Sequence, residues 1–306
     1  MKKKILITGA EGFIGRKLRK FLIAKKNYKV FSTYYKKKIT GLGNNSIKCD
    51  VRKIDDIKKI IKKIRPHYIF HLAAKSHPTY SFKFPLDTLN TNIIGTANLF
   101  ESVKNYSSKT KIIVACSSAE FGSFSKEELP IDEKFKKNPE HLYGLSKLVQ
   151  DLLSLQYFKM FKMNICRAII FNTSGSGKNF DVFQDFKSQI IKQKKNKTIL
   201  LKVGNINNLR DFSHVDDTVT ALYLLMQRGK SGESYIISSN KLEKISNILK
   251  IIKKQLNKKI IIKKNKNLLR KYDEKFIQGN NNKIRKLGWS PKKNLRDIVK
   301  DILNEK

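Results

Sequence analysis

The segment that most constrains the fold is Thr8–Gly15, which reads Thr-Gly-Ala-Glu-Gly-Phe-Ile-Gly. It follows an apolar run typical of a strand, and the apolar residues of 13–26 then recur with helical spacing. In this context Gly9 permits a tight turn, Gly12 lets the backbone approach a diphosphate, and Gly15 allows close helix–strand packing. The helix N-terminus would present free N–H groups to the phosphates. The motif therefore predicts a dinucleotide-binding site near the start of the chain.

Segments with strand and helix patterns alternate through the first half of the chain. Strand-like runs cover residues 4–8, 28–33, 47–50, 68–72, 111–116 and 165–171, and helical spacing covers 13–26, 54–64, 86–106 and 142–162. This alternation predicts a parallel sheet with right-handed crossovers and helices on both faces. We expect an α/β fold, with a Rossmann-type doubly wound parallel sheet over residues 1–171. A smaller substrate-binding lobe would take up most of 172–306, with some segments returning to the sheet.

The chain carries 65 Lys and Arg against 25 Asp and Glu, a formal net charge of +40. The lysines are spread along the whole sequence without a recognisable nucleic-acid-binding module, so we interpret them as solvated surface. The three cysteines form no CxxC pair and the histidines lack metal-ligand spacing, which argues against a disulfide framework or a metal site. No apolar run approaches the roughly 20 residues that span a bilayer. We expect a cytoplasmic protein that binds neither nucleic acid nor membrane.

The end of the second predicted strand bears on the choice of cofactor. NAD-specific sites of this type usually place an acid there, where it bonds the ribose 2′-hydroxyl. Here residues 32–38 contain no carboxylate and end in Lys36, Lys37 and Lys38. These cations would attract the 2′-phosphate of NADP, so the sequence favours NADP, with NAD as the alternative. Asp50, after the third strand, would either contact the adenine edge or cap the next helix.

Three further residues form a candidate catalytic set. Ser117 ends the fifth strand, and Tyr143 and Lys147 are four residues apart, hence on one face of a helix. A phenol with a pKa of about 10 is a poor acid or base at neutral pH, and an adjacent ammonium lowers that pKa. Ser117 would hold a carbonyl oxygen that Tyr143 protonates. The set predicts proton transfer at a carbonyl group.

Taken in order, the motifs resemble the extended short-chain dehydrogenase/reductase family. They are Thr8–Gly15, His71–Ala74, Ser117–Ser118 and Tyr143–Lys147. The resemblance implies an NAD(P)-dependent oxidoreductase whose catalytic residues are Ser117, Tyr143 and Lys147. It also implies cofactor contacts from Gly9, Glu11, Gly12, Phe13, Ile14, Gly15, Tyr35, Lys36, Asp50, Val51, Leu72, Ala73, Ala74, Asn92, Tyr143 and Lys147.

Over nearly the whole chain, further segments resemble the branch of GDP-mannose dehydratases and GDP-4-keto-6-deoxymannose reductases. They include Asn90–Thr96, Phe171–Asn172, Phe183–Phe186, Val203–Asn205, Arg210–Phe212 and Gly279–Lys283. The branch implies a nucleotide-sugar substrate held by Ser76, His77, Ser118, Asn172, Val182, Lys187, Arg210, Arg270 and Asp273. The chain departs from the family pattern at Phe121 (usually Tyr), at Gly175–Gly177 (usually Gly-Pro-Gly) and at Lys271 (usually Pro).

The position two residues after Ser117 separates the reactions of this branch. Dehydratases of the family carry a carboxylate there, which removes the C5 proton and protonates the departing C6 oxygen; here the residue is Ala119. Glu120 is adjacent, but successive residues of an extended chain point to opposite sides unless a local bulge intervenes. The resemblance then implies an NADPH-dependent reductase that converts GDP-4-keto-6-deoxymannose to GDP-6-deoxymannose (GDP-rhamnose). GDP-mannose 4,6-dehydration, nucleotide-sugar 4-epimerisation and a non-catalytic, cofactor-bound scaffold are the alternatives.

The predicted helix over residues 142–162 has an apolar surface wider than one buried stripe needs. Its apolar residues include Leu145, Leu148, Val149, Leu152, Leu153 and Leu155. In the family, this helix and the one over 86–106 pair with their copies. The resemblance therefore implies a homodimer with a four-helix interface.

Overall fold

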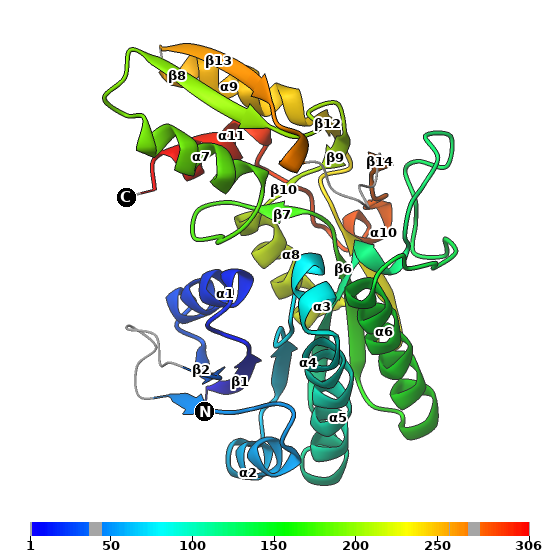
Figure 1. Cartoon of the computed structure of the whole chain (residues 1–306). Helices are drawn as coiled ribbons and strands as arrows, with labels where there is room; N and C mark the ends of the chain where they lie inside the picture. The colour runs from blue at the N-terminus through cyan, green and yellow to red at the C-terminus, as the bar shows by residue number, and fades with distance from the viewer. Residues whose placement is uncertain (1, 37–44, 257, 269–275, 306) are drawn as a thin grey trace.

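The computed structural model of the chain describes residues 2–36, 45–256, 258–268 and 276–305. Its centre is a seven-stranded parallel sheet in the order β11-β6-β5-β4-β1-β2-β3 (Figure 1). The strands are β1 (Lys3–Thr8), β2 (Tyr28–Tyr34), β3 (Ser46–Lys48), β4 (Tyr68–His71), β5 (Lys111–Ser117), β6 (Ile165–Ile170) and β11 (Ser234–Ile237). The predicted Rossmann-type sheet is confirmed.

The direction of winding reverses at β1. From β1 the chain runs outward through β2 and β3, and it then returns to the other side of β1 to build β4, β5 and β6. In open sheets of this kind, ligands bind outside the carboxyl ends of the strands at the reversal. Thr8 and His71 end the two strands that flank this point. The topology therefore predicts a ligand site at the carboxyl ends of β1 and β4.

Helices cover both faces of the sheet and enclose two apolar cores. They are α1 (Phe13–Ala24) and α8 (Val215–Arg228) on one face, and α2 (Ile54–Ile64), α5 (Gly95–Tyr106) and α6 (Leu142–Phe161) on the other. Ile61 and Leu99 are fully buried in the core under α2 and α5, as are Leu18 and Leu222 in the core under α1 and α8. The helices α1, α2, α5 and α8 thus pack their apolar stripes onto the sheet. In α6 the buried side chains are mostly polar, among them Lys147, Gln150 and Asp151.

The predicted helix over residues 86–106 contains a π-helical turn. It is built from α4 (Pro85–Leu89), the turn Asn90–Ile94 and α5, and a separate short helix α3 (Pro78–Lys83) precedes it. Gly95 is the first residue of α5. The helix passes so close to the loop after β3 at this point that a Cβ on Gly95 would lie 2.7 Å from Val51 Cγ2. This close approach brings the segment after β4 alongside the loop after β3.

The C-terminal half builds a smaller lobe and also contributes to the main sheet (Figure 1). The lobe contains β7 (Thr173–Ser174), α7 (Val182–Lys192), β8 (Thr198–Val203), β9 (Leu209–Asp211), β10 (Ser213–His214), β12 (Leu242–Lys244), α9 (Ile245–Leu256), β13 (Lys259–Lys264), β14 (Phe276–Ile277) and α11 (Leu295–Leu303). Its core joins Phe186, Leu201, Leu249 and Ile298. By contrast, β11, α8 and α10 (Asn282–Arg285) pack with the sheet.

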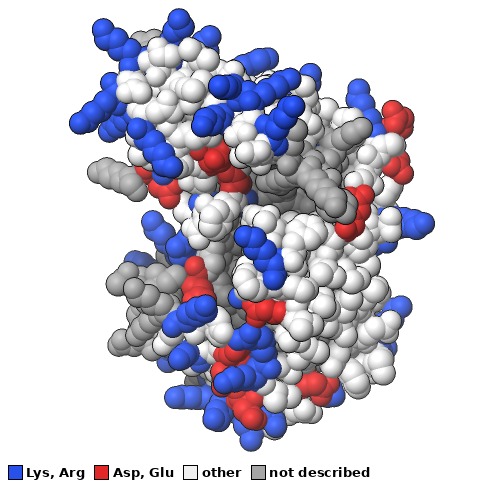
Figure 2. Space-filling model, in the orientation of Figure 1, with Lys and Arg blue, Asp and Glu red and all other residues white. Residues whose placement is uncertain are grey.

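The surface carries its positive charge on both parts of the molecule. Figure 2 shows Lys and Arg over the lobe and over the sheet-containing part of the face in view, with acidic side chains between them. Among the helices that the structure describes, none is both long and apolar enough to cross a membrane.

Candidate active site

A cleft of about 1390 Å³ runs along the carboxyl ends of β1, β4 and β5 and continues against the C-terminal lobe. Its lining includes the predicted residues Gly9, Glu11, Gly12, Phe13, Ile14, Gly15, Tyr35, Asp50, Val51, Leu72, Ala73, Ala74, Ser76, His77, Ser117, Ser118, Tyr143, Lys147, Asn172, Val182 and Arg210. Residues that lie far apart in the sequence therefore meet around one space. The sheet's point of reversal and the catalytic motif open into the same cleft.

The glycine motif forms the floor of one end of this cleft. Gly9 has a φ of +66°, and a Cβ there would lie 2.7 Å from Ala73 Cα, so a side chain would collide with the strand-end loop of β4. A Cβ on Gly15 would lie 2.3 Å from the carbonyl oxygen of Gly9, which shows how closely α1 approaches the loop. Gly12 lies just before the first turn of α1. The backbone N–H groups at this helix N-terminus are placed to bind phosphate.

A carboxylate lies at the end of β2, although the sequence of this strand predicts none. Glu11, from the glycine motif, accepts a hydrogen bond from the backbone N of Tyr35 at 3.2 Å, so an acid reaches this position from another segment. Lys36 is exposed and is not among the residues that line the cleft. Lys37 and Lys38 lie outside the described residues. Residues 32–38 alone therefore do not determine the charge at the end of β2, because Glu11 adds a carboxylate from the glycine motif.

Arg52 organises the neighbouring part of the cleft and was not predicted. Its Nη2 donates to Tyr35 Oη at 2.5 Å and to Asp50 Oδ2 at 2.7 Å, while Nη1 lies 2.6 Å from Asp87 Oδ1. The hydrogen bond from Arg52 lowers the pKa of the Asp50 carboxyl. Lys53 is the N-cap residue of α2, without a side-chain capping bond, so the capping alternative for Asp50 is wrong. Asp50 lines the cleft with its carboxylate turned toward Arg52.

The three residues of the candidate catalytic set lie together in the cleft. Ser117 ends β5, and Tyr143 and Lys147 lie on the first turns of α6. A Cβ on Gly144 would lie 2.3 Å from the carbonyl oxygen of Ala119, so the first turn of α6 packs directly on the turn that follows Ser117. The His141 ring stacks on Tyr143 with centroids 6.0 Å apart, and its Nδ1 caps the helix by accepting from Gly144 N at 2.9 Å. His141 was not predicted. Its place directly before the expected helix is the signal that could have identified it as an N-cap residue.

The electrostatics of this set correct one expectation. Burial raises the pKa of Tyr143 to about 12, and a hydrogen bond with Ser117 opposes the shift. Burial also lowers the pKa of Lys147 to about 8. Lys147 Nζ donates to the carbonyl oxygen of Ala115 and to Gln150 Oε1, both at 2.8 Å. Desolvation thus raises the phenol pKa where the sequence predicts a lowering by the ammonium, and Tyr143 is a protonated phenol at neutral pH.

A buried hydrogen-bond chain connects Lys147 with the end of β1. Gln150 Nε2 donates to Thr96 Oγ1 at 2.9 Å, and His71 joins Thr96 Oγ1 (3.0 Å) to Thr8 Oγ1 (2.8 Å). Burial lowers the pKa of His71 to about 3, so the ring is neutral. His71 therefore has a structural role, as a buried link between two hydroxyl groups. This series of hydrogen bonds fixes Lys147 relative to the glycine loop.

Asn92 and Lys187 do not reach the cleft, in contrast to their predicted roles. Asn92 is fully buried and bonds the backbone N of Lys75 at 2.8 Å and Ser146 Oγ at 2.9 Å, which holds the loop after β4 from behind. Lys187 pairs with Glu305 at 2.7 Å and is not among the lining residues. Short polar contacts within the protein thus satisfy both side chains. Arg270 and Asp273 lie outside the described residues.

The far end of the cleft lies between the two parts of the molecule. Phe180, which is 72% exposed, approaches His77 with ring centroids 6.1 Å apart. Asn172 contributes a buried Nδ2 that has no hydrogen-bond partner among the described residues, and Arg210 is 8% exposed. Phe180 was not predicted, because no local pattern in the sequence marks it. This end offers an aromatic ring, an amide donor and a guanidinium to a ligand.

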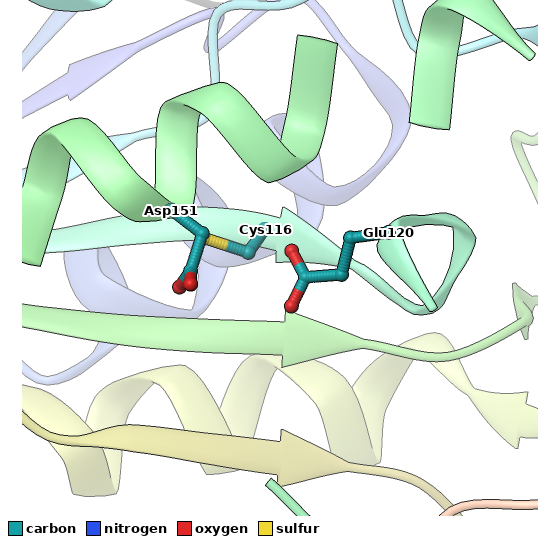
Figure 3. A group of neighbouring side chains, drawn as sticks. All are labelled: Cys116, Glu120 and Asp151. Carbon is teal, nitrogen blue, oxygen red and sulfur yellow. The ribbon is translucent and has the colours of Figure 1, made fainter. Parts of the chain in front are cut away.

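Ala119 and Glu120 occupy different environments. Ala119 lines the cleft, whereas Glu120 is fully buried and its Oε1 lies 2.9 Å from Lys137 Nζ. Residues 118–120 form a 3₁₀ turn. This turn directs the Glu120 side chain into the protein (Figure 3), and Glu120 is not among the residues that line the cleft. A local bulge that delivers Glu120 to the cleft is therefore not observed.

Known proteins of similar sequence cover the whole chain. A GDP-6-deoxy-D-mannose reductase of Pseudomonas aeruginosa is 24% identical, with 100% of this chain and 97% of that protein aligned. A GDP-mannose 4,6 dehydratase of Caenorhabditis elegans is 25% identical, over 99% of this chain and 88% of the relative.

The fold is also shared with solved structures. RMD from P. aeruginosa, complexed with NADPH, superposes with a TM-score of 0.86 at 22% identity, over 99% of this chain and 98% of that one. A UDP-glucose 4-epimerase of Thermotoga maritima with UDP-glucose gives a TM-score of 0.86 at 24% identity, over 98% and 97% of the two chains. The profile of the GDP-mannose 4,6 dehydratase family matches residues 6–302. The chain is therefore an enzyme of the extended short-chain dehydrogenase/reductase class and belongs to the GDP-mannose 4,6 dehydratase family.

Proposed function

We propose that the protein reduces the C4 ketone of GDP-4-keto-6-deoxymannose with NADPH, giving GDP-6-deoxymannose (GDP-rhamnose). The observation that carries the proposal is Ala119 in the cleft beside an intact set of Ser117, Tyr143 and Lys147. Dehydration requires a group that removes the C5 proton and protonates the departing C6 oxygen. Reduction of a ketone requires only one hydride and one proton. The similarity to the P. aeruginosa reductase along the full chain supports the same reaction.

The described residues can perform the protonation that such a reduction needs. NADPH would supply the hydride. Ser117 hydrogen-bonds the C4 carbonyl oxygen, and Tyr143 donates its phenolic proton to that oxygen as negative charge develops on it. The raised pKa of Tyr143 keeps the phenol protonated at neutral pH, the form that a reductase requires. Lys147 stabilises the phenolate that remains, and its proximity follows from the four-residue spacing on α6.

The cleft suits a dinucleotide at one end and a nucleotide sugar at the other. The helix N-terminus after Gly12 and the close approach at Gly9 form a cradle for a diphosphate. We propose NADP as the cofactor because Lys36 to Lys38 follow the β2 end, with NAD as the alternative because Glu11 also reaches it. The orphan amide of Asn172 and the guanidinium of Arg210 would bind the sugar nucleotide. The P. aeruginosa structure with NADPH supports the cofactor assignment.

GDP-mannose 4,6-dehydration is the second candidate. The family profile and the C. elegans relative favour it. The burial of Glu120 and the presence of Ala119 argue against it, since no carboxylate takes the acid–base position in the described cleft. A 4-epimerase, like the T. maritima neighbour, would need no such carboxylate and is the third candidate. The protonated tyrosine beside Ser117 makes a non-catalytic scaffold the weakest interpretation.

Two incubations test the proposal. In the first, the purified protein meets GDP-mannose with catalytic NADP; in the second, it meets GDP-4-keto-6-deoxymannose with stoichiometric NADPH. We expect NADPH consumption and GDP-6-deoxymannose only in the second. Accumulation of the 4-keto sugar in the first would show a dehydratase and refute the proposal. No reaction in either, followed by turnover of UDP-glucose or dTDP-glucose derivatives, would refute the GDP assignment.

We also propose that the protein is a homodimer. Exposed apolar side chains lie along α3 to α6. They are Phe82, Phe84, Leu86, Ile94, Leu145, Leu152, Met160 and Phe161. Burial of such a face against a second copy would remove this apolar surface from water. Pairing of the helices 86–106 and 142–162 with their copies would give the four-helix interface.

A further inference from the structure

The loop between β7 and α7, residues 175–181, lies between α1 and the C-terminal lobe (Figure 1). On the side of α1, Lys17 Nζ donates to Ser176 Oγ at 2.8 Å, and Arg16 Nη2 donates to the carbonyl oxygen of Gly177 at 2.6 Å. Both donors lie in the first two turns of α1, the helix that begins at the glycine motif. The loop is therefore bonded to the part of the protein that would hold the cofactor diphosphate.

On the other side, the same two loop residues bond the C-terminal end of the lobe. The backbone N of Ser176 donates to Asp301 Oδ2 at 2.7 Å, and the backbone N of Gly177 donates to Glu305 Oε1 at 2.6 Å. Asp301 belongs to α11, whose apolar face is part of the core of the lobe, and Glu305 follows that helix. Residues 175–178, called the strap below, thus connect α1 with the core of the lobe.

Each of these hydrogen bonds has a charged partner. Lys17 and Arg16 donate from cations, and Asp301 and Glu305 accept as carboxylates. Burial acts to raise the pKa of Asp301, but the hydrogen bonds from Ser176 and the charge of Lys17 lower it below its usual value. Charge-assisted hydrogen bonds are stronger than neutral ones. Because Lys17 is half-buried and Arg16 is exposed, the bond between Lys17 and Ser176 contributes more to this connection.

Ser176 stands where the family usually has the proline of Gly-Pro-Gly. Proline has no backbone N–H and no side-chain hydroxyl, so it could bond neither Asp301 nor Lys17. The glycines on either side are retained, with φ angles of +149° at Gly175 and +86° at Gly177. The departure from the family pattern therefore adds hydrogen bonds on both sides of the strap.

The strap also borders the cleft. Gly177 and Lys178 line it together with Gly12 and Phe13 at the start of α1. Lys178 Nζ lies 5.9 Å from the centroid of the Phe13 ring. Ser176 is not among the residues that line the described cleft, so it can influence bound ligands only through the elements that it connects.

We propose that Ser176 is a positioning residue that, through Lys17 and Asp301, fixes the C-terminal lobe relative to the glycine motif. This inference deepens the proposed function and rests on it. The cofactor diphosphate would bind at the start of α1, whereas Arg210 in the lobe would hold the sugar nucleotide. Transfer of a hydride between ligands that are held by different parts of the molecule depends on how those parts are placed. The strap fixes this placement next to the glycine motif.

The first test uses NADPH alone. A diphosphate at the start of α1 would restrain Lys17, and through it the strap and α11. In the wild type we expect saturating NADPH to slow hydrogen exchange of residues 295–305 by roughly fivefold or more, measured by mass spectrometry. Lys17→Met and Ser176→Ala remove the same hydrogen bond from its two sides. Both should lose most of this protection, while the glycine motif remains protected by NADPH.

The second test separates kcat from cofactor affinity. In Lys17→Met and Ser176→Ala we expect kcat to fall by about tenfold, because the two ligands are less well aligned, and the Kd for NADPH to stay near that of the wild type. Ser176→Pro restores the usual family residue and removes both bonds of Ser176, so its loss of kcat should be at least as large. A role in stability alone would not divide kcat from NADPH affinity in this way.

Lys20→Met is the matched control, since Lys20 is an exposed lysine of α1, three residues after Lys17, and among the described residues it does not bond the strap. It should behave like the wild type in both tests. The inference would be overturned by NADPH protection of 295–305 that is absent in the wild type, that persists in Lys17→Met and Ser176→Ala, or that is lost equally in Lys20→Met. A wild-type kcat in Ser176→Pro would overturn it as well. If the sugar substrate is wrongly assigned, turnover fails but the exchange measurements still give their result, so the two failures are distinguishable.

Discussion

The contact between α6 and the Ser117 turn makes Gly144 the sharpest single position to perturb. In Gly144→Ala the new Cβ would start 2.3 Å from the carbonyl oxygen of Ala119 and 3.0 Å from Pro139 Cβ. A contact of this kind needs more than 3.0 Å, so the turn or the helix must move by roughly 1 Å. The movement separates Ser117 from Tyr143, which in the proposed reaction hold and protonate the carbonyl oxygen. Misplacement by about 1 Å costs roughly 10²-fold in rate.

We therefore expect kcat of Gly144→Ala to fall about 10²-fold, with a smaller change in NADPH affinity, because the glycine motif that would bind the diphosphate follows β1 and is not part of α6. Stopped-flow measurement of NADPH oxidation and fluorescence titration give the two values. Gly229→Ala is the matched control, since its Cβ would lie 2.7 Å from the Leu225 carbonyl oxygen, with an ordinary φ of −60° and away from the cleft. It should lower thermal stability and leave kcat unchanged. Equal kcat values in Gly144→Ala and the wild type would refute the reasoning.

Three further outcomes are expected. Tyr143→Phe keeps the ring and loses the proton donor, so kcat should fall by about 10²–10⁴-fold with sugar-nucleotide binding retained in calorimetry; near-normal turnover would contradict the assigned role. Replacement of Lys36, Lys37 and Lys38 by Gln should raise the KM for NADPH and hardly change that for NADH, and a wild-type preference for NADH would show that the cofactor assignment is wrong. Leu152→Asp, at a side chain that is 46% exposed on α6, should convert a dimer to monomers in sedimentation velocity, whereas a monomeric wild type would exclude the proposed interface.

The sheet and its helices were predictable because their signal is local. The helix over residues 54–64 matches α2 at both ends, since its four buried isoleucines recur with helical spacing and no other segment is needed to read it. The catalytic set was predictable for a related reason. Strand ends and helix starts place Ser117, Tyr143 and Lys147, and these boundaries are visible in the sequence. The resemblance to a known family added the order of the motifs.

The wrong predictions concern residues whose contact partners lie far away in the sequence. Glu11 contacts Tyr35 at the end of β2, and Lys187 pairs with Glu305. No local sequence pattern predicts either contact. The predicted direction of the Tyr143 pKa shift was also wrong. The four-residue spacing to Lys147 predicts a nearby charge, but it carries no information on the burial that raises this pKa. The residues of segment 32–38 were the only ones considered at the end of β2, and Glu11 comes from another segment. Side-chain contacts and burial are tertiary properties, so composition and spacing alone do not predict them.

The placement of Glu120 connects the reaction with the packing of the protein. In an extended strand Glu120 would alternate with its neighbours, but the 3₁₀ turn after Ser117 buries it against Lys137 and leaves Ala119 in the cleft. A buried carboxylate is costly unless it is paired, and here the pair extends to Asp151 and Arg167. Moving Glu120 to the cleft would leave Lys137 short of one of its two partners. This ion-pair network thus holds the carboxylate away from the cleft, which supports the proposed ketone reduction over dehydration.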